Sequence, residues 1–74
     1  MIYNVLSSYD DHAFSCSQYT EYDKALMKFF SQFSTNIANH NTACAMIVDN
    51  FGNVLKMEHY AKEIIDQTEE NTEE

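Results

Sequence analysis

With 74 residues, the chain is long enough for one domain but lies near the lower size at which a single hydrophobic core suffices, so a metal, a disulfide or a second copy is expected to add stability. Its 45% of apolar residues, with five Phe and five Tyr, exclude a wholly disordered chain. The formal charge of −8, without any arginine, disfavours direct binding to nucleic acid because no basic stripe can neutralise phosphates.

Two strands joined as a hairpin are expected at the N-terminus. Residues 1–7 carry apolar side chains on both alternating phases, which is typical of a central strand covered on two faces. The turn-forming run SSYDD follows, and residues 13–19 then alternate Phe14 and Cys16 with serines. This pattern predicts the second strand.

A helix of about five turns is expected to begin after Thr20, which can cap it, with Asp23 in the first turn where the helix dipole favours a negative charge. Asn39 or Asn41 can supply a left-handed cap at its end. Apolar residues recur at helical spacing and predict that one stripe of the helix covers a sheet. That stripe consists of Tyr22, Ala25, Leu26, Phe29, Phe30, Phe33 and Ile37.

Residues 42–49 and 54–60 are predicted to form a second hairpin, with Gly52 adopting positive φ in the turn. The last run sets Leu55, Met57 and His59 on one phase against Val54, Lys56, Glu58 and Tyr60 on the other, which indicates a sheet with one wet side. The chain is therefore expected to be α+β, in the order β-β-α-β-β, with the helix on one face of a four-stranded antiparallel sheet. Residues 60–65 also fit a short C-terminal helix.

We expect one domain over residues 1–65 and a solvated, disordered tail over residues 66–74, which hold five of the twelve acids and no base. The N-terminus has no basic segment and no apolar run long enough for a signal peptide or a membrane span. A cytoplasmic protein that does not contact a membrane is therefore expected.

Each of the two cysteines follows a histidine by four residues, in HAFSC (12–16) and HNTAC (40–44). This spacing raises a divided zinc site or a reactive thiol with its base as alternatives to two buried thiols. Residues four apart in a strand are separated by about 13 Å, which is too far for two ligands of one zinc ion. We therefore expect no metal and no cofactor, and free thiols packed in the sheet.

No enzyme is expected. A nucleophile could be assembled from Cys16 or Cys44 with a histidine and an acid such as Asp11, but the sequence has no glycine-rich turn to place a thiol beside an oxyanion site. A domain of this size also leaves little room for a substrate pocket. A catalytic function is therefore a weaker hypothesis than a binding function.

Apolar side chains are expected to remain on the sheet face that the helix leaves open, and such faces usually mark interfaces. We expect a homodimer through that face. The residues expected there are Tyr3, Val5, Tyr19, Val54 and Tyr60.

In length, acidity and architecture the chain resembles the small inhibitors that phages and mobile elements encode against bacterial defence systems, the anti-CRISPR proteins among them. The resemblance includes no diagnostic motif. It implies a protein that binds a host nuclease or effector complex and blocks its nucleic-acid groove or its assembly, with acidic side chains facing the target's lysines and arginines. The acids that would do so are Asp10, Asp11, Glu21, Asp23 and Asp49. A homo-oligomer that sequesters a nucleotide and a structural phage protein are the alternatives.

Overall fold

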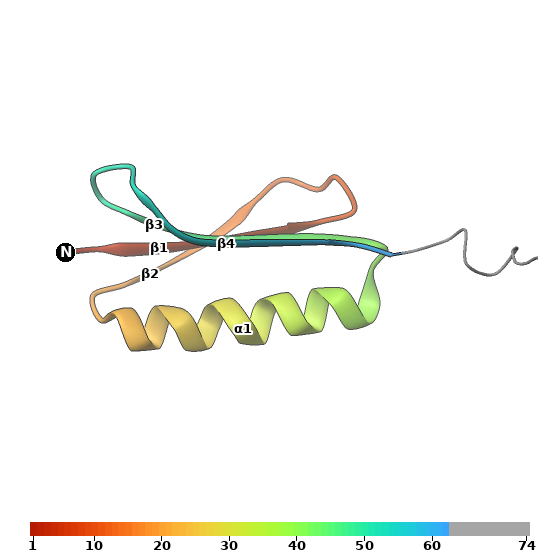
Figure 1. The fold of residues 1–74 in the computed structure, drawn as a ribbon, viewed down its shortest axis with the longest axis horizontal. Coiled ribbons are helices and arrows are strands. Elements are labelled where there is room, and N and C mark those ends of the chain that lie inside the picture. The colour runs from red at the N-terminus through yellow and green to blue at the C-terminus, as the bar shows by residue number, and fades with distance from the viewer. Residues whose placement is uncertain (63–74) are drawn as a thin grey trace, which may run out of the picture.

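The computed structural model describes residues 1–62 and shows a four-stranded sheet with one helix on one face (Figure 1). The β-β-α-β-β order and the α+β class expected from the sequence are confirmed. The elements are β1 (Tyr3–Tyr9), β2 (Ser15–Tyr19), α1 (Tyr22–Asn39), β3 (Thr42–Asp49) and β4 (Val54–Ala61).

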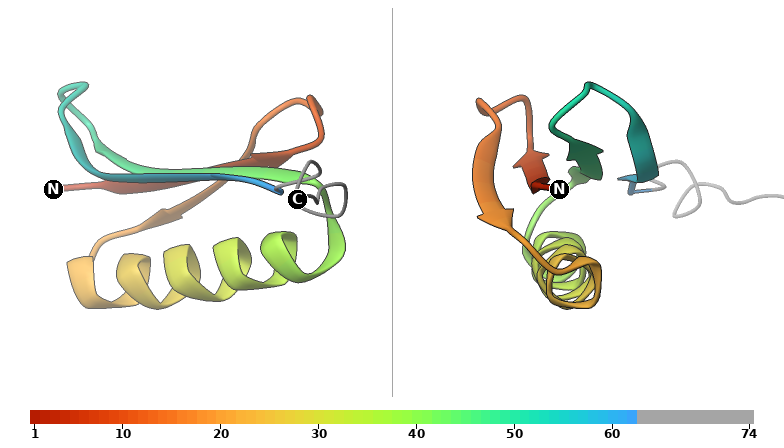
Figure 2. Two further views of the ribbon diagram at one scale, coloured as in Figure 1. Left: turned by 45° about the vertical axis from the view of Figure 1, so that its right-hand side comes forward. Right: turned by 90° about the vertical axis from the view of Figure 1, so that its left-hand side faces the viewer.

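All neighbouring strands are antiparallel, in the order β2-β1-β3-β4. The two inner strands, β1 and β3, are paired although the helix separates them in sequence, with Val5 opposite Ile47. The central place expected for the first strand is therefore confirmed. Helix α1 runs along the sheet from the β2–α1 turn at one end to the α1–β3 loop at the other (Figures 1 and 2).

The core lies between the apolar stripe of α1 and the inner strands. Ala25 and Phe29 of the helix are fully buried against Val5, Ala45 and Ile47. Small alanine side chains let the helix approach the sheet closely, and Phe29 and Ile47 are the largest fully buried side chains. Most of the amphipathic stripe predicted from the sequence thus covers the sheet, whereas Phe30, also expected in the stripe, is 54% exposed.

The ends of α1 differ from those expected. Glu21, in extended backbone, precedes the helix and makes no side-chain cap, so the expected cap by Thr20 is wrong. The helix ends at His40, also extended, whose N–H donates to the Asn36 carbonyl, and neither Asn39 nor Asn41 is left-handed. Among residues 1–62, positive φ occurs instead in the β1–β2 turn and at Gly52, where it was expected.

Strand β4 continues to Ala61, so Tyr60 and Ala61 are extended rather than helical. Residues 63–65 of the suggested short helix, and the expected acidic tail at 66–74, lie outside the described residues. In the described part of the chain, no helix combines the length and the apolar character needed to cross a membrane.

Candidate binding face

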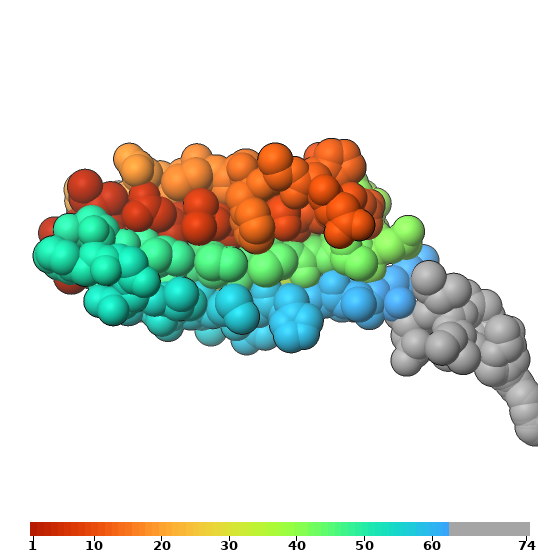
Figure 3. All heavy atoms as spheres, turned by 90° about the horizontal axis from the view of Figure 1, so that it is seen from above, coloured from red at the N-terminus to blue at the C-terminus, as the bar shows by residue number. Residues whose placement is uncertain are grey.

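One face of the sheet has no covering layer within residues 1–62, and we call it the open face (Figures 1 and 3). Residues paired across antiparallel strands point to the same side of a sheet, so the strand registers assign its members. The open face consists of Asn4, Leu6, Ser8, Cys16, Gln18, Thr42, Cys44, Met46, Val48, Val54, Met57, His59 and Ala61.

The open face is uncharged, and its apolar side chains include adaptable methionines. None of its residues is Asp, Glu or Lys, in a chain whose formal charge is −8. A row of apolar and sulfur-containing side chains crosses all four strands near the middle of their length. It consists of Cys16, Leu6, Met46 and Met57. Thioether side chains adapt to irregular partner surfaces, so this row is suited to contact another surface.

The apolar side chains of β4 point mainly toward the open face. Lys56 and Glu58 pair with helix-side residues of β3, whereas Met57 pairs with Met46. The wet side of this strand therefore lies on the helix side, because α1 packs mainly on β1, β3 and β2 and leaves β4 beyond its edge (Figure 2). On the helix side, the Lys56 ammonium lies 5.2 Å from the centre of the Phe30 ring. This is a cation–π contact on the flank of α1.

Four of the five residues expected to drive self-association lie on the other side of the sheet. Val5 is only 2% exposed and belongs to the core, against which Tyr3 and Tyr19 pack. Tyr60 pairs with Ala43, a buried helix-side residue. Their predicted placement is wrong, because apolar residues on both phases of the first strand did not show which phase meets the helix. Val54 does lie on the open face.

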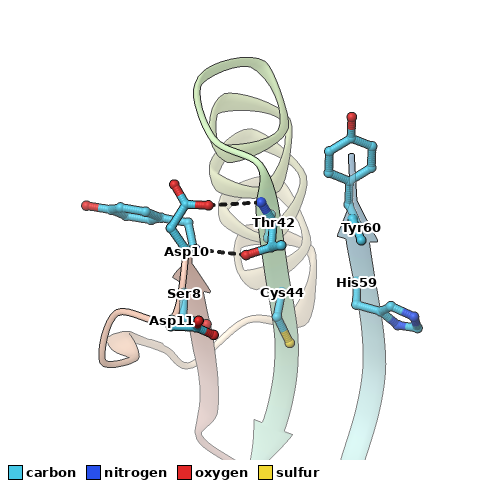
Figure 4. A pocket seen from close by; sticks show the side chains of 10 residues that line it. Ser8, Asp10, Asp11, Thr42, Cys44, His59 and Tyr60 are labelled. Atoms are coloured by element: carbon cyan, nitrogen blue, oxygen red, sulfur yellow. Dashed lines mark hydrogen bonds between the residues drawn. The ribbon is translucent and has the colours of Figure 1, made fainter. Parts of the chain in front are cut away.

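A hollow of about 260 Å³ lies at the end of the sheet near the β1–β2 turn (Figure 4). Its lining includes Asp10, Asp11, Cys44, His59 and Tyr60. Cys44 and His59 are directly opposite each other on β3 and β4, yet the His59 ring points away from Cys44 (Figure 4). The hollow therefore does not place a base against a nucleophile, and its carboxylates oppose the binding of phosphate groups.

The carboxylate of Asp10 joins the β1–β2 turn to the α1–β3 loop. Its Oδ1 accepts the backbone N–H groups of Asn41 and Thr42, each at 3.0 Å, and its Oδ2 lies 3.2 Å from His40 Nδ1. The backbone N–H of Asp10 in turn donates to Thr42 Oγ1 at 2.9 Å. Asp10 adopts φ +47°, a left-handed conformation that Asp tolerates better than most residues.

Asp49 has a similar role at the opposite end of the sheet. It is buried, and its Oδ1 accepts the N–H groups of Phe51 and Asn53 at 2.9 Å, closing the β3–β4 turn. Both Asp10 and Asp49 are thus occupied by local backbone groups, and their expected role as contacts to a target's lysines and arginines is not supported. Sequence reasoning overlooked the signal that Asp10 follows a strand and Asp49 ends one, each at a turn.

The remaining acids of the expected electrostatic contact do not form one surface. Asp11, Glu21 and Asp23 are exposed. Asp11 lies at the β1–β2 end of the sheet, whereas Glu21 and Asp23 lie at the opposite end, where α1 begins (Figure 1). The three acids are therefore divided between the two ends of the sheet and form no continuous acidic row.

The two His–Cys pairs are separated by the fold. His12 Nδ1 lies 3.0 Å from the Tyr9 carbonyl oxygen, and His40 stacks on the Tyr9 ring with centroids 3.7 Å apart. Cys16 and Cys44 are free and lie on β2 and β3, two strand spacings of about 4.8 Å apart with β1 between them, which is too far for a disulfide. Within residues 1–62, no group of three or more His, Cys, Asp or Glu side chains is arranged to hold a metal ion.

The stability of the chain should depend on the charge of Asp10. Hydrogen bonds from the Thr42 and Asn41 N–H groups, with the adjacent His40, hold the pKa of Asp10 below its ordinary value despite partial burial. A lowered pKa in the folded state stabilises the fold above the ordinary carboxyl pKa of about 4, and this contribution is lost as the pH falls through the lowered value. We expect Asp10→Asn to lower the urea midpoint at neutral pH and to flatten its dependence on acid pH.

The matched control is Asp11→Asn, which changes an exposed neighbouring acid in the same turn. Urea unfolding followed by circular dichroism between about pH 7 and about pH 2.5 compares the variants across the window in which carboxylates titrate. Equal pH profiles for the Asp10 and Asp11 variants would show that the carboxylate of Asp10 does not secure the loop.

Comparisons of the chain with protein-family models, with curated proteins and with solved structures give no significant match.

Proposed function

We propose that this chain is a non-catalytic protein-binding inhibitor that acts in the cytoplasm of a bacterial host and contacts protein through its open face. The observation that carries the proposal is the open face, an uncharged sheet surface with an apolar row across four strands. The resemblance in size and acidity to phage-encoded anti-defence inhibitors points to a host nucleic-acid-targeting complex as the target.

Binding through the open face would be driven by removal of apolar surface from water, at about 25 cal/mol per Å². Met57 is 54% exposed and lies at the β4 end of the apolar row, so it has a large apolar surface to lose there. The rigid sheet beneath the row limits the conformational entropy lost on binding. A contact of this kind blocks a partner by occupying its surface.

The structure gives less support to mimicry of nucleic acid. A mimic needs acidic side chains in rows on one ordered surface, whereas the exposed acids of residues 1–62 lie at both ends of the sheet and on its edge strand. Sequestration of a nucleotide is likewise disfavoured, because the hollow near the β1–β2 turn is lined by Asp10 and Asp11 and by no lysine. Steric blocking by an apolar contact is the mechanism that fits best.

The test compares two Met-to-Lys variants that differ only in where the charge is placed. Met57→Lys puts an ammonium on the β4 strand of the open face, and Met27→Lys puts it on the solvent side of α1, where the side chain is 72% exposed. Proteins captured from a bacterial lysate by the tagged wild-type chain are identified by quantitative mass spectrometry. We expect Met27→Lys to keep the specific partner and Met57→Lys to reduce its capture at least about tenfold, since an unpaired charge at an apolar contact is costly.

Equal capture by both variants would reject the open face as the contact. A wild-type chain that captures no protein above a scrambled-sequence control would reject the protein-binding function itself.

A further inference from the structure

We propose that the open face is covered by a second copy of the same chain, giving a homodimer in which two sheets pack face to face with the helices outside. This inference rests on the proposed function in that it uses the same open face: a second copy covers the face in the free protein, and the contact between copies is weak enough for a target to take its place. Four features of the chain support it: the size of its core, the pattern of β4, the distribution of charge and the shape of the face.

The core of one copy is small. The buried apolar residues among residues 1–62 are Val5, Ala25, Phe29, Ala43, Ala45 and Ile47, and three of these six are alanines. Domains of this size bury a small share of their surface and usually need a further stabiliser. In the described part of the chain no disulfide and no metal cluster supplies one, so a second layer on the open face fills that role.

In β4, apolar and charged side chains alternate in a way that suits a strand covered by apolar residues on the side facing away from α1. Met57 and Val54 face that side and are 54% and 56% exposed, while Lys56 and Glu58 face the helix side. The adjacent Leu55 occupies the register irregularity between Val54 and Lys56 and is also exposed. Residues 1–62 of a single chain leave these apolar side chains in water, and a sheet packed against them would remove their surface from water.

Charge favours a second copy over a strongly charged partner. Two acidic chains repel each other, yet residues of the open face contribute no Asp, Glu or Lys to a contact between copies. A basic or acidic partner would meet no opposite charge on this face. A twofold contact instead places each copy's apolar row against the other, which is the self-complementary arrangement of most dimers.

The shape of the face also suits a twofold partner. The β1–β2 loop rises above the open face at one end on the β2 side, and the β3–β4 loop rises at the opposite end on the β4 side (Figures 1 and 2). The raised loops thus occupy two diagonal corners. A twofold axis parallel to the sheet brings the partner's loops over the two free corners, so the loops of both copies fit beside each other.

The area of the face sets the expected affinity. Four strands about 4.8 Å apart and about seven residues long cover roughly 450 Å² per copy, or roughly 900 Å² for two copies before side-chain roughness is added. Specific interfaces begin near about 1,200 Å² of accessible surface, so the dimer belongs to the small class. We expect a dissociation constant in the micromolar range, which makes the dimer dependent on concentration.

The chain contains its own reporters, because both of its cysteines lie on the open face. Cys16 is exposed and Cys44 is half-buried in the single chain. Covering the face should slow their alkylation by a maleimide, whereas a contact through the helix should not. Full-length protein is measured from about 1 µM to about 500 µM, a range chosen to span a micromolar dissociation constant.

We expect light scattering to show a monomer turning into a dimer over this range, with alkylation of the thiols slowed at least about fivefold at the upper end. Met57→Lys and Val54→Lys should each raise the dissociation constant at least about tenfold and keep the thiols reactive, because each buries a charge between the sheets. Met27→Lys should behave like the wild-type chain. Circular dichroism shows whether each variant is folded. Because two open-face positions are tested, the result does not depend on one variant that fails to fold.

A wild-type chain that stays monomeric at the upper concentration would overturn the dimer, as would a dimer that leaves both thiols fully reactive or that forms equally well in all variants. Assembly beyond a dimer would also overturn it and would favour a structural protein. These results are separable from the proposed function: a monomer whose lysate partner is lost only in Met57→Lys would reject the second copy and keep protein binding, and a dimer that captures nothing would do the reverse.

Discussion

Replacing Phe29 by alanine is expected to unfold most of the protein at room temperature. Phe29 is completely buried and, with Ile47, is one of the two largest fully buried side chains in residues 1–62. Its ring lies 6.1 Å from that of Phe33 and 5.2 Å from that of Phe30, so it is central to the helix–sheet contact. Truncation of a buried Phe to Ala costs about 3–5 kcal/mol, which is most of the stability of a small domain.

The control for this variant is its neighbour on the helix. Phe30 is 54% exposed and lies on the flank of α1 beside Lys56, so Phe30→Ala should cost no more than about 1 kcal/mol. Urea unfolding by circular dichroism measures both, at one protein concentration because a dimer makes apparent stability depend on it. Similar midpoints for the two variants would show that Phe29 does not anchor the core.

The elements of the fold could be predicted because each has a local signal. The helical spacing of apolar residues marked α1, and Gly52 marked the turn of the second hairpin, where φ is +88°. Antiparallel pairing of four strands with one helix is the simplest way to bury one apolar stripe. These inferences needed no knowledge of which residues meet across the sheet.

The two faces of the sheet could not be assigned in the same way. In β1 both phases are apolar, and whether Val5 or Leu6 meets the helix depends on packing with β3 and α1, which are far away in sequence. In β4 the register irregularity near Leu55 shifts the phase of the strand, and the helix does not cover the strand. The result is that the predicted contact residues were placed mostly on the wrong side.

The candidate acidic contact failed for a different reason. Counting charges treated all acids alike, whereas Asp10 and Asp49 each lie where a strand meets a turn and accept hydrogen bonds from backbone N–H groups of a neighbouring turn or loop. These hydrogen bonds also lower the pKa of both carboxyl groups, with Thr42 the main donor to Asp10 and Asn53 to Asp49. An acid at a turn is therefore weak evidence for a charged partner.

The open face and the small core have one physical explanation. Strands β1 and β3 need apolar cover on both sides, and the single helix covers only one of them. On the helix side the two strands carry Val5, Ala45 and Ile47, which α1 covers, while Leu6 and Met46 lie on the side that α1 does not cover. Apolar side chains of this size on the uncovered side are what a second packed layer would bury.

Replacing Asn36 by leucine is expected to stabilise the protein, although the residue is only 2% exposed and lies on the buried side of α1. Within residues 1–62, its Nδ2 group has no hydrogen-bond partner, and its Oδ1 accepts only a long 3.4 Å bond from Gln32. An unsatisfied buried donor costs about 1–3 kcal/mol, and leucine has nearly the same branched shape without polar atoms. We therefore expect Asn36→Leu to gain about 1–2 kcal/mol, measured by urea unfolding.

Asn36→Asp supplies the opposite test at the same position. It keeps the shape but replaces the unpaired donor with a carboxylate, whose burial without a partner should destabilise the fold by at least about 3 kcal/mol at neutral pH. Burial disfavours the ionised form, so this loss should diminish as the pH falls and the carboxyl group takes up a proton. If Asn36→Leu lowered stability while Asn36→Asp was tolerated, the amide would have a polar partner on this face of the helix, and the space beneath α1 would be polar rather than part of the apolar core.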